Sequence, residues 1–258
     1  MKITKKTINS EENSEIYERS IFLSDIHVPF QDKNSLNVVN RFIKWFEPKT
    51  IFLVGDIIDF YSISTFDKDP QRINNLQSDI DETHKVLESI RKNSPRSDIV
   101  YLEGNHELRL KRYLWKHPEI ASLKALSFEN LLGLKELKIK YKPSQEICLF
   151  HGFYIEHGDI VRKHSGYTAH GQMEKRGISG LSGHSHRLST HYLTNMGGNF
   201  VWAENGCLCN TICDYIIGLP NWQQGFTVGY FKKDMKRFSL EQISIIHNKC
   251  VYAGKEFK

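Results

Sequence analysis

The chain has 258 residues, of which 40% are hydrophobic and 25% are charged, and this is enough material for one α/β domain with a sizeable core. Its 35 basic and 30 acidic residues leave a formal net charge of +5, which could suit a phosphate-bearing substrate but is too small to indicate a protein that coats nucleic acid. No apolar run is long enough for a membrane span, and the polar residues 1–18 hold no apolar signal-peptide core, so we expect a cytoplasmic protein that has no membrane partner.

Strand-length apolar runs alternate with helix-period segments in the first half of the chain. We predict strands at 20–25, 50–56 and 98–105, separated by helices at 35–46 and 73–92. This alternation implies parallel strands joined by right-handed crossovers. Residues 107–141 break the pattern with short helical pieces, and they form either a cap beside the site or plain filler.

The second half of the chain is dominated by short strands. We predict them at 146–150, 153–157, 178–182, 199–205, 225–231 and 238–246. No linker, repeat or low-complexity tract divides the sequence, so residues 1–258 are expected to form a single domain with residues 1–18 as a polar N-terminal extension. The predicted fold class is α/β, with a mixed sheet or a pair of packed sheets.

Ligand-type side chains follow each of the first three predicted strands. The runs are DIH (25–27), GDIID (55–59) and GNHE (104–107), and HGD (157–159) and GHSH (183–186) come later. In an extended segment residues i and i+2 point to the same side, so Asp25 and His27 leave their strand together. Ligands bind at the carboxyl ends of strands in open α/β sheets, and five such runs in this order are hard to explain as core histidines or solvated carboxylates.

These runs resemble the five sequence blocks of the calcineurin-like metallophosphoesterases, over roughly residues 21–187. In addition, ENGC and NWQQGF, within 204–226, resemble the C-terminal strands of small phage and bacterial members. The resemblance implies two packed mixed β-sheets flanked by helices, with a dinuclear metal centre at the sheet edge. It implies that Asp25, His27 and His186 hold one metal, that Asn105, His184 and a histidine of the fourth block hold the other, and that Asp56 bridges both.

The resemblance further implies a phosphoric ester hydrolase that acts on phosphodiesters or phosphomonoesters through attack of a metal-bridging hydroxide. Carboxylate, amide and imidazole ligands suit two divalent ions, with Mn²⁺ expected first and Fe, Zn²⁺ or Co²⁺ as alternatives. Two such ions can clamp the attacking and leaving oxygens of an in-line displacement. A nuclease acting on DNA or RNA is the alternative within catalysis, and a non-catalytic scaffold of the same fold is the alternative outside it.

The fourth block is ambiguous because the sequence contains His-Gly twice, at 151 and 157. His151 could lie in a hairpin turn, with Gly152 supplying the turn. His157 ends a predicted strand and precedes His184 by a separation like that of the family. We therefore favour His157 as the metal ligand.

Other residues are expected to act on the substrate. By the family pattern, His106 is a general acid or phosphate contact, and Asp59 orients it. Arg109 and Arg187 could contact phosphate, although a solvated helix face is the favoured interpretation for Arg109. Protein phosphatases of the superfamily carry an arginine where Phe60 stands, so we expect Phe60 and Tyr61 to offer apolar surface beside the metals, with Tyr61 as a substrate contact.

The cysteines are not expected to hold a structural zinc ion. The five thiols include Cys207, Cys209 and Cys213, but the gaps between these three match no structural zinc pattern. Without a secretion signal, reduced thiols are the expected state. The expected partner is a phosphoester substrate, which could be a nucleotide or a nucleic acid.

Overall fold

The computed structural model describes residues 17–68, 75–212, 218–232 and 237–258. Its first sheet has six strands, in the order β11-β10-β1-β2-β3-β4. Strands β1 to β4 are parallel neighbours, β10 pairs antiparallel with β1, and β11 pairs antiparallel with β10. Their bounds are β1 (Glu18–Leu23), β2 (Thr50–Val54), β3 (Asp98–Leu102), β4 (Ile139–Lys142), β10 (Gly225–Lys232) and β11 (Arg237–Ser244).

The second sheet has five strands in the order β5-β6-β7-β9-β8, and it mixes parallel and antiparallel pairs. Its strands are β5 (Cys148–Phe150), β6 (Phe153–Glu156), β7 (Gly180–Ser182), β8 (Ser189–Asn195) and β9 (Gly198–Glu204). A separate hairpin of β12 (Cys250–Tyr252) and β13 (Lys255–Phe257) ends the chain close to α1 (Lys33–Phe46). The predicted pair of mixed sheets is confirmed.

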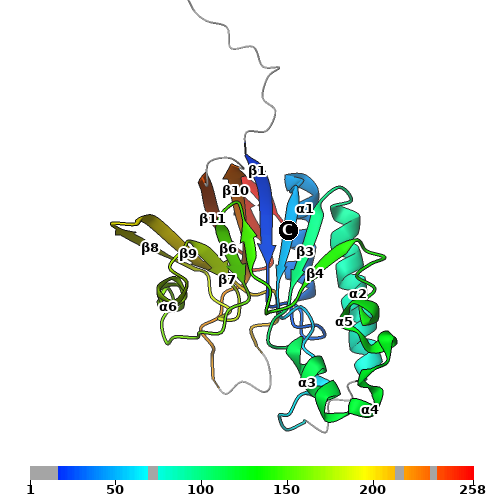
Figure 1. Ribbon diagram of the computed structural model, residues 1–258. Coiled ribbons are helices and arrows are strands. Elements are labelled where there is room, and N and C mark those ends of the chain that lie inside the picture. The colour runs from blue at the N-terminus through cyan, green and yellow to red at the C-terminus, as the bar shows by residue number, and fades with distance from the viewer. Residues whose placement is uncertain (1–16, 69–74, 213–217, 233–236) are drawn as a thin grey trace, which may run out of the picture.

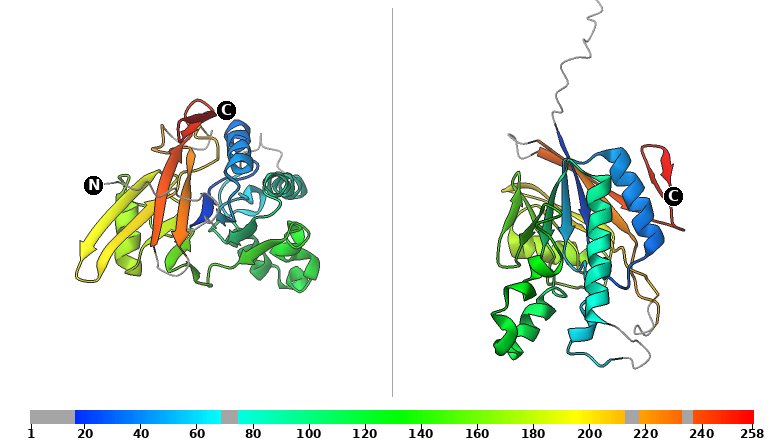
Figure 2. Two further views of the ribbon diagram at one scale, coloured as in Figure 1. Left: turned by 90° about the horizontal axis from the view of Figure 1, so that it is seen from above. Right: turned by 90° about the vertical axis from the view of Figure 1, so that its right-hand side faces the viewer.

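Helices cover the outer faces of both sheets, so the molecule has four layers (Figure 1; Figure 2, left). Helices α1 and α2 (Leu76–Asn93) lie on the first sheet, and α6 (Tyr167–Arg176) lies on the second. Strand alternation builds these layers, because successive side chains point to opposite faces. On β1, Ile21 and Leu23 belong to the helix-facing core, whereas Phe22 packs in the core between the sheets and stacks on Phe52 with ring centroids 5.2 Å apart.

Helix α1 shows how local sequence sets an element. The Asp32 side chain caps its first turn by accepting from the backbone N–H groups of Asn34 and Ser35, both at 2.9 Å. Residues at helical spacing, among them Val39 and Phe42, are fully buried against the sheet. Burying each such side chain contributes about 1.5–3 kcal/mol. The predicted helix at 35–46 is thus confirmed, and it begins two residues earlier, at Lys33.

Residues 107–141 form several short helices before they join the first sheet. These are α3 (Leu108–Lys116), α4 (Pro118–Ala121), a 3₁₀ turn η2 (Lys124–Leu126) and α5 (Phe128–Leu131), followed by β4. The α5 residue Phe128 is buried and packs edge-on against Tyr101 of β3 at 5.3 Å. The last part of this segment therefore belongs to the core of the first sheet.

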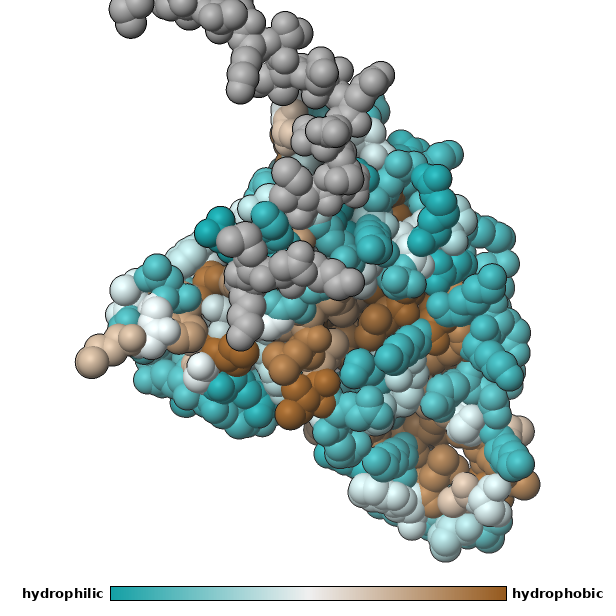
Figure 3. Space-filling view, turned by 45° about the horizontal axis from the view of Figure 1, so that its top comes forward, coloured by the Kyte–Doolittle hydropathy of each residue, from teal (hydrophilic) through white to brown (hydrophobic). Residues whose placement is uncertain are grey.

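The face seen in Figure 3 is largely hydrophilic, with apolar side chains gathered across its middle and at its lower right. Exposed apolar residues lie at the edge strand β5, where Leu149 is 57% exposed, and next to it at Ile147. None of the helices described is both long and apolar enough to cross a bilayer.

Candidate metal centre

The ligand-type side chains predicted from the sequence converge where the carboxyl ends of both sheets meet. Each comes from a loop directly after a strand, so parallel pairing brings the loops together. Asp25 and His27 follow β1, Asp56 and Asp59 follow β2, Asn105 and His106 follow β3, His157 follows β6, and His184 and His186 follow β7.

One group of ligand atoms comes from Asp25, His27 and His186, which are all buried, and these atoms lie within 4.8 Å of one another. The two Nε2 atoms of His27 and His186 are 3.1 Å apart, and Asp25 Oδ1 lies 3.2 Å from His186 Nε2. Two imidazole nitrogens and a carboxylate oxygen thus face one point. This donor set fits a divalent transition metal.

A second group is formed by Asp56, His157 and His184, again with ligand atoms within 4.8 Å. His157 Nε2 lies 3.1 Å from Asp56 Oδ2 and 3.0 Å from Asn105 Oδ1. The same oxygen, Asp56 Oδ2, is 3.8 Å from His27 Nε2 of the first group. Asp56 therefore stands between the two groups, where one carboxylate could bridge two ions.

Partners on the far ring nitrogens set the tautomers of the ligand histidines. His157 Nδ1 lies 2.8 Å from the Val54 carbonyl oxygen, which can only accept, so Nδ1 carries the proton. His27 Nδ1 lies 3.1 Å from Asp59 Oδ2 and donates in the same way. Both rings therefore turn Nε2 toward the shared centre, and this is the nitrogen that could bind a metal ion.

The backbone at five of these positions is strained. Asp25, His27, Asp56, His184 and His186 all have positive φ angles, between 52° and 68°. The left-handed region costs a residue with a side chain on the order of 1–2 kcal/mol. Such strain persists only where surrounding contacts outweigh it, and it is typical of functional sites.

Two glycines of the sequence blocks are required by close packing behind the ligands. A Cβ atom at Gly55 would lie 2.6 Å from His157 Nδ1, and its φ of 80° favours glycine in any case. A Cβ atom at Gly104 would lie 2.3 Å from Asp56 Oδ1. The glycines in GDIID and GNHE thus make room for the side chains of His157 and Asp56, which belong to the second ligand group.

Glu107 is a site residue that the sequence interpretation missed, although it ends the GNHE block. Its buried carboxylate accepts backbone N–H groups from Asp56 (2.9 Å), Ile57 (2.8 Å) and Gly104 (2.8 Å) and the hydroxyl of Tyr101 (2.7 Å). Burial, and next the charge of Asp56, raise the pKa of Glu107 above its ordinary value. This side chain joins the loops after β2 and β3.

His106 belongs to a network with Asp59 and Arg109. His106 Nδ1 lies 3.1 Å from Asp59 Oδ2, and Arg109 Nη1 donates to Asp59 Oδ1 at 2.9 Å. Arg109 Nη2 lies 3.2 Å from His106 Nε2 and can only donate, so Nε2 accepts and the ring proton sits on Nδ1. Arg109 therefore contacts both His106 and Asp59, so it does not lie on a solvated helix face.

The buried charges of the two groups shift one another's pKa values. Burial opposes ionisation of Asp25 and Asp56, yet neighbouring histidines hold both carboxyl pKa values well below the usual range. Burial likewise lowers the pKa of His157, but the attraction of Asp56 outweighs it and raises the pKa to about 10. For His184, the effect of burial outweighs the attraction of Asp25 and Asp56, and the pKa is lowered.

The remaining predicted residues lie outside these groups. Tyr61 begins a 3₁₀ turn, η1 (Tyr61–Ile63), with its ring edge-on to Phe30 at 5.9 Å. Phe60 is fully buried, so the expectation that it offers surface beside the metals is wrong. It packs inward because the chain turns at a φ of 52° there. Arg187 follows His186 and donates to the Asn221 carbonyl oxygen at 3.1 Å.

The two His-Gly runs lie in different places. His157 is in the second ligand group, whereas His151 lies in the turn between β5 and β6, with Nε2 3.4 Å from Glu18 Oε2.

Two thiols adjoin the first group. Cys209 Sγ is 3.9 Å from His186 Nδ1, and the ligand atoms of His186, Cys207 and Cys209 lie within 4.8 Å of one another. Cys213 falls outside the described residues.

Comparison with known proteins defines the class. Residues 19–188 match the sequence model of the calcineurin-like phosphoesterases, so the chain belongs to this family, as its motifs predict. Gene 54 protein of Mycobacterium phage L5 is 29% identical over 228 residues, which cover 82% of this chain and 88% of that protein. Gene 54 protein of Mycobacterium phage D29 is also 29% identical, over 81% and 87% of the two chains.

The solved structures that resemble this chain are more distant in sequence than the two phage proteins. A Vps29 single mutant from Entamoeba histolytica is 11% identical, with a TM-score of 0.47, over 90% of this chain and 97% of that one. Yfce, a phosphoesterase from E. coli, is also 11% identical, with a TM-score of 0.39, over 88% of this chain and 100% of that one.

Proposed function

We propose that the protein is a dinuclear metal-dependent phosphoesterase. The observation that carries the proposal is the position of Asp56, whose Oδ2 lies 3.1 Å from His157 of one ligand group and 3.8 Å from His27 of the other. A carboxylate shared between two sets of imidazoles, in a phosphoesterase family, fits a pair of ions that neutralise phosphate charge and activate water when bound. Mn²⁺ is the ion we favour, because the two sets contain no thiolate.

Each ligand residue has a defined part in this proposal. Asp25, His27 and His186 would hold one ion, and Asn105, His157 and His184 the other. Asp59 keeps Nε2 of His27 free for its ion by accepting the proton of the other ring nitrogen.

His106 would manage the proton of the leaving group. Its Nε2 lies 3.7 Å from Asp56 Oδ2, so this nitrogen faces the place where phosphate would bind. A second proton on Nε2 would make the ring an acid for the departing oxygen, and the Asp59 carboxylate would stabilise that charge. Because protonated Nε2 no longer accepts, we expect the Arg109 guanidinium then to turn toward the phosphate.

Metal-titrated hydrolysis tests the proposal. Protein stripped with chelator should be inactive, and Mn²⁺ should restore hydrolysis of a nitrophenyl monoester or a bis-nitrophenyl diester as two ions bind. Asp56→Asn should lower activity more than Asp25→Asn, because it weakens both ligand groups at once. Full activity with a single bound ion would refute the dinuclear mechanism, and two bound ions without hydrolysis of any ester would indicate a binding scaffold.

A further inference from the structure

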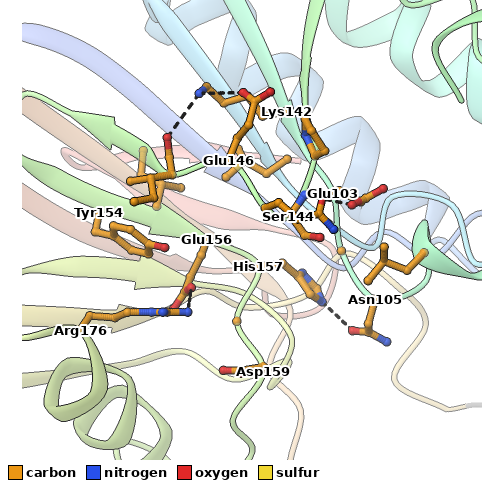
Figure 4. Close-up of a pocket in the computed structure, with 18 of the residues that line it drawn as sticks. Glu103, Asn105, Lys142, Ser144, Glu146, Tyr154, Glu156, His157, Asp159 and Arg176 are labelled. Carbon is orange, nitrogen blue, oxygen red and sulfur yellow. Dashed lines mark hydrogen bonds and ion pairs between the residues drawn. The ribbon is translucent and has the colours of Figure 1, made fainter. Parts of the chain in front are cut away.

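The second ring nitrogen of His186 faces a thiol. In the other ligand group, His157 turns Nε2 toward Asn105, as Figure 4 shows, and its Nδ1 faces a backbone carbonyl oxygen at 2.8 Å. His186 Nδ1 instead lies 3.9 Å from Cys209 Sγ. A carbonyl oxygen only accepts, but a thiol can donate or accept, so this partner leaves either nitrogen of His186 able to carry the proton.

A second thiol completes a set of three donors. The ligand atoms of His186, Cys207 and Cys209 lie within 4.8 Å of one another, and all three residues are buried. Around a tetrahedral zinc ion, a sulfur at about 2.3 Å and an imidazole nitrogen at about 2.0–2.1 Å from the metal are about 3.6 Å apart. The 3.9 Å between Cys209 Sγ and His186 Nδ1 is therefore close to the spacing that one ion requires.

Hydrogen bonds to a short segment, residues 223–224, hold the three donors in place. Gln223 N–H donates to the His186 carbonyl oxygen at 2.8 Å, and the Gln223 carbonyl oxygen accepts from Cys207 N–H at 3.1 Å. The side-chain amide of Gln224 donates to the Cys209 carbonyl oxygen at 2.9 Å. Because the backbone is already fixed, binding of an ion here would order little further chain.

The chemistry of the donors selects a thiophilic cation. Two sulfur atoms and an imidazole suit an ion such as Zn²⁺, whereas the carboxylates of the two ligand groups also suit Mn²⁺. Three protein donors leave a fourth tetrahedral position for water. The donors lie just beneath the surface, because Asn210, next to Cys209, is exposed, and Trp222, whose ring centroid is 4.3 Å from that of His186, is half-buried.

We propose that His186, Cys207 and Cys209 form a binding site for a thiophilic ion such as Zn²⁺, and that this site competes with the first ligand group for His186. A neutral imidazole has one nitrogen free to bind an ion, either Nε2 beside Asp25 or Nδ1 beside the thiols. When Nδ1 binds, the ring proton is on Nε2, which can donate to Asp25 Oδ1 at 3.2 Å. The site goes beyond the proposed function, and the competition rests on the metal binding which that function requires.

Cadmium tests the site directly, because thiolates bound to Cd²⁺ give an ultraviolet charge-transfer absorption that nitrogen and oxygen ligands do not give. The full chain, treated with chelator and kept reduced, should gain this absorption up to one equivalent of Cd²⁺. Cys207→Ser and Cys209→Ser should each weaken the binding by at least about 100-fold, because a lost ligand costs more than the roughly 10–100-fold lost with an outer partner. Unchanged binding in both variants would overturn the site.

Further variants separate a lost ligand from a general effect on the fold. Cys209→Ala, which avoids burying a hydroxyl, should behave like Cys209→Ser. The matched controls Cys148→Ser and Cys250→Ser replace buried thiols in β5 and β12 and should keep the absorption and the affinity. Cys213→Ser should keep them as well. A loss in any control as large as that in Cys209→Ser would contradict the proposal.

The same absorption tests the competition for His186. With saturating Mn²⁺, the Cd²⁺ concentration that half-saturates the thiolate signal should rise by about tenfold or more, because both ions then require one imidazole. Replacement of Mn²⁺ by Cd²⁺ among the carboxylates and imidazoles alone would leave this midpoint in place. His186→Ala should remove the effect of Mn²⁺, and a midpoint that does not respond to bound Mn²⁺ would show that the imidazole is not shared.

Binding also separates this site from the proposed function. A thiolate signal that Cys207→Ser and Cys209→Ser abolish, in a protein that binds no Mn²⁺ and hydrolyses no ester, would support the thiol site and overturn the proposed activity. Ester hydrolysis by the Mn²⁺-loaded protein, without a thiolate signal at any Cd²⁺ concentration, would support the activity and overturn the thiol site.

Discussion

Replacing Glu107 by glutamine should damage both stability and metal binding. Oε1 accepts from Ile57 N–H and the Tyr101 hydroxyl, and Oε2 accepts from Asp56 N–H and Gly104 N–H. A glutamine amide keeps one accepting oxygen but turns an NH₂ group toward two buried donors. Hydrogen bonds to a charged group contribute about 1.5–3 kcal/mol each, so losing two of four should cost about 3–6 kcal/mol.

Urea unfolding of chelator-treated protein measures this cost without interference from bound metal. Glu103→Gln is the matched control, because Glu103 is also buried but accepts from a single backbone N–H, that of Ser144 at 2.9 Å. We further expect Glu107→Gln to weaken Mn²⁺ binding by about 10–100-fold, since it frees the loop that carries Asp56. A loss of less than about 1 kcal/mol, no larger than in the control, would refute the view that Glu107 holds the two loops together.

Three further predictions concern the proton donor, the fourth block and a buried acid. His106→Ala should keep both metals, lose little activity on nitrophenyl esters and lose about 10²–10⁴-fold on alkyl esters, whose leaving groups need a proton; equal losses on both would point to phosphate binding instead. His157→Ala should lose one metal and at least about 10²-fold in rate, whereas His151→Ala should change mainly stability; metal analysis would show the reverse if the ligand were misassigned. Burial raises the pKa of Asp79 to about 6, so the folded state keeps its proton longer than the unfolded state does, and stability is lost as pH rises from about 4 to 6. Asp79→Asn should therefore stabilise the protein by about 1–2 kcal/mol at pH 7 and have no effect at pH 4, as urea unfolding at both values would show.

The elements that place the site could be predicted because their signals are local. The strands before Asp25, Asp56 and Asn105 are apolar runs that end in ligand-type residues, and buried parallel strands have that pattern. Edge strand β8 was missed because STHYLTN is polar and half-exposed, so no apolar run marks it. Helix α6 was missed because its buried stripe is short and mixes polar with apolar residues.

Roles that depend on distant contacts could not be predicted. Nothing in the sequence shows that Glu107 accepts N–H groups from a loop about 50 residues earlier, or that Arg109 reaches Asp59 across the same interval. Phe60 was expected at the site because it follows ligand-type residues, yet its backbone turns the ring into the core. Sequence spacing indicates which residues leave a strand end together but not where each side chain points.

Each ligand group draws residues from both sheets, and this has a consequence for how the chain folds. His27 and His186 meet at 3.1 Å although 159 residues separate them along the chain. A contact of such long range forms only after both sheets have docked, because closing so large a loop is entropically costly. Ions bound there would act as cross-links that only the finished fold can make, and a concentration of 100 times the dissociation constant would stabilise that fold by about 2.7 kcal/mol per ion. Metal supply during synthesis would then govern how long the newly made protein survives proteolysis.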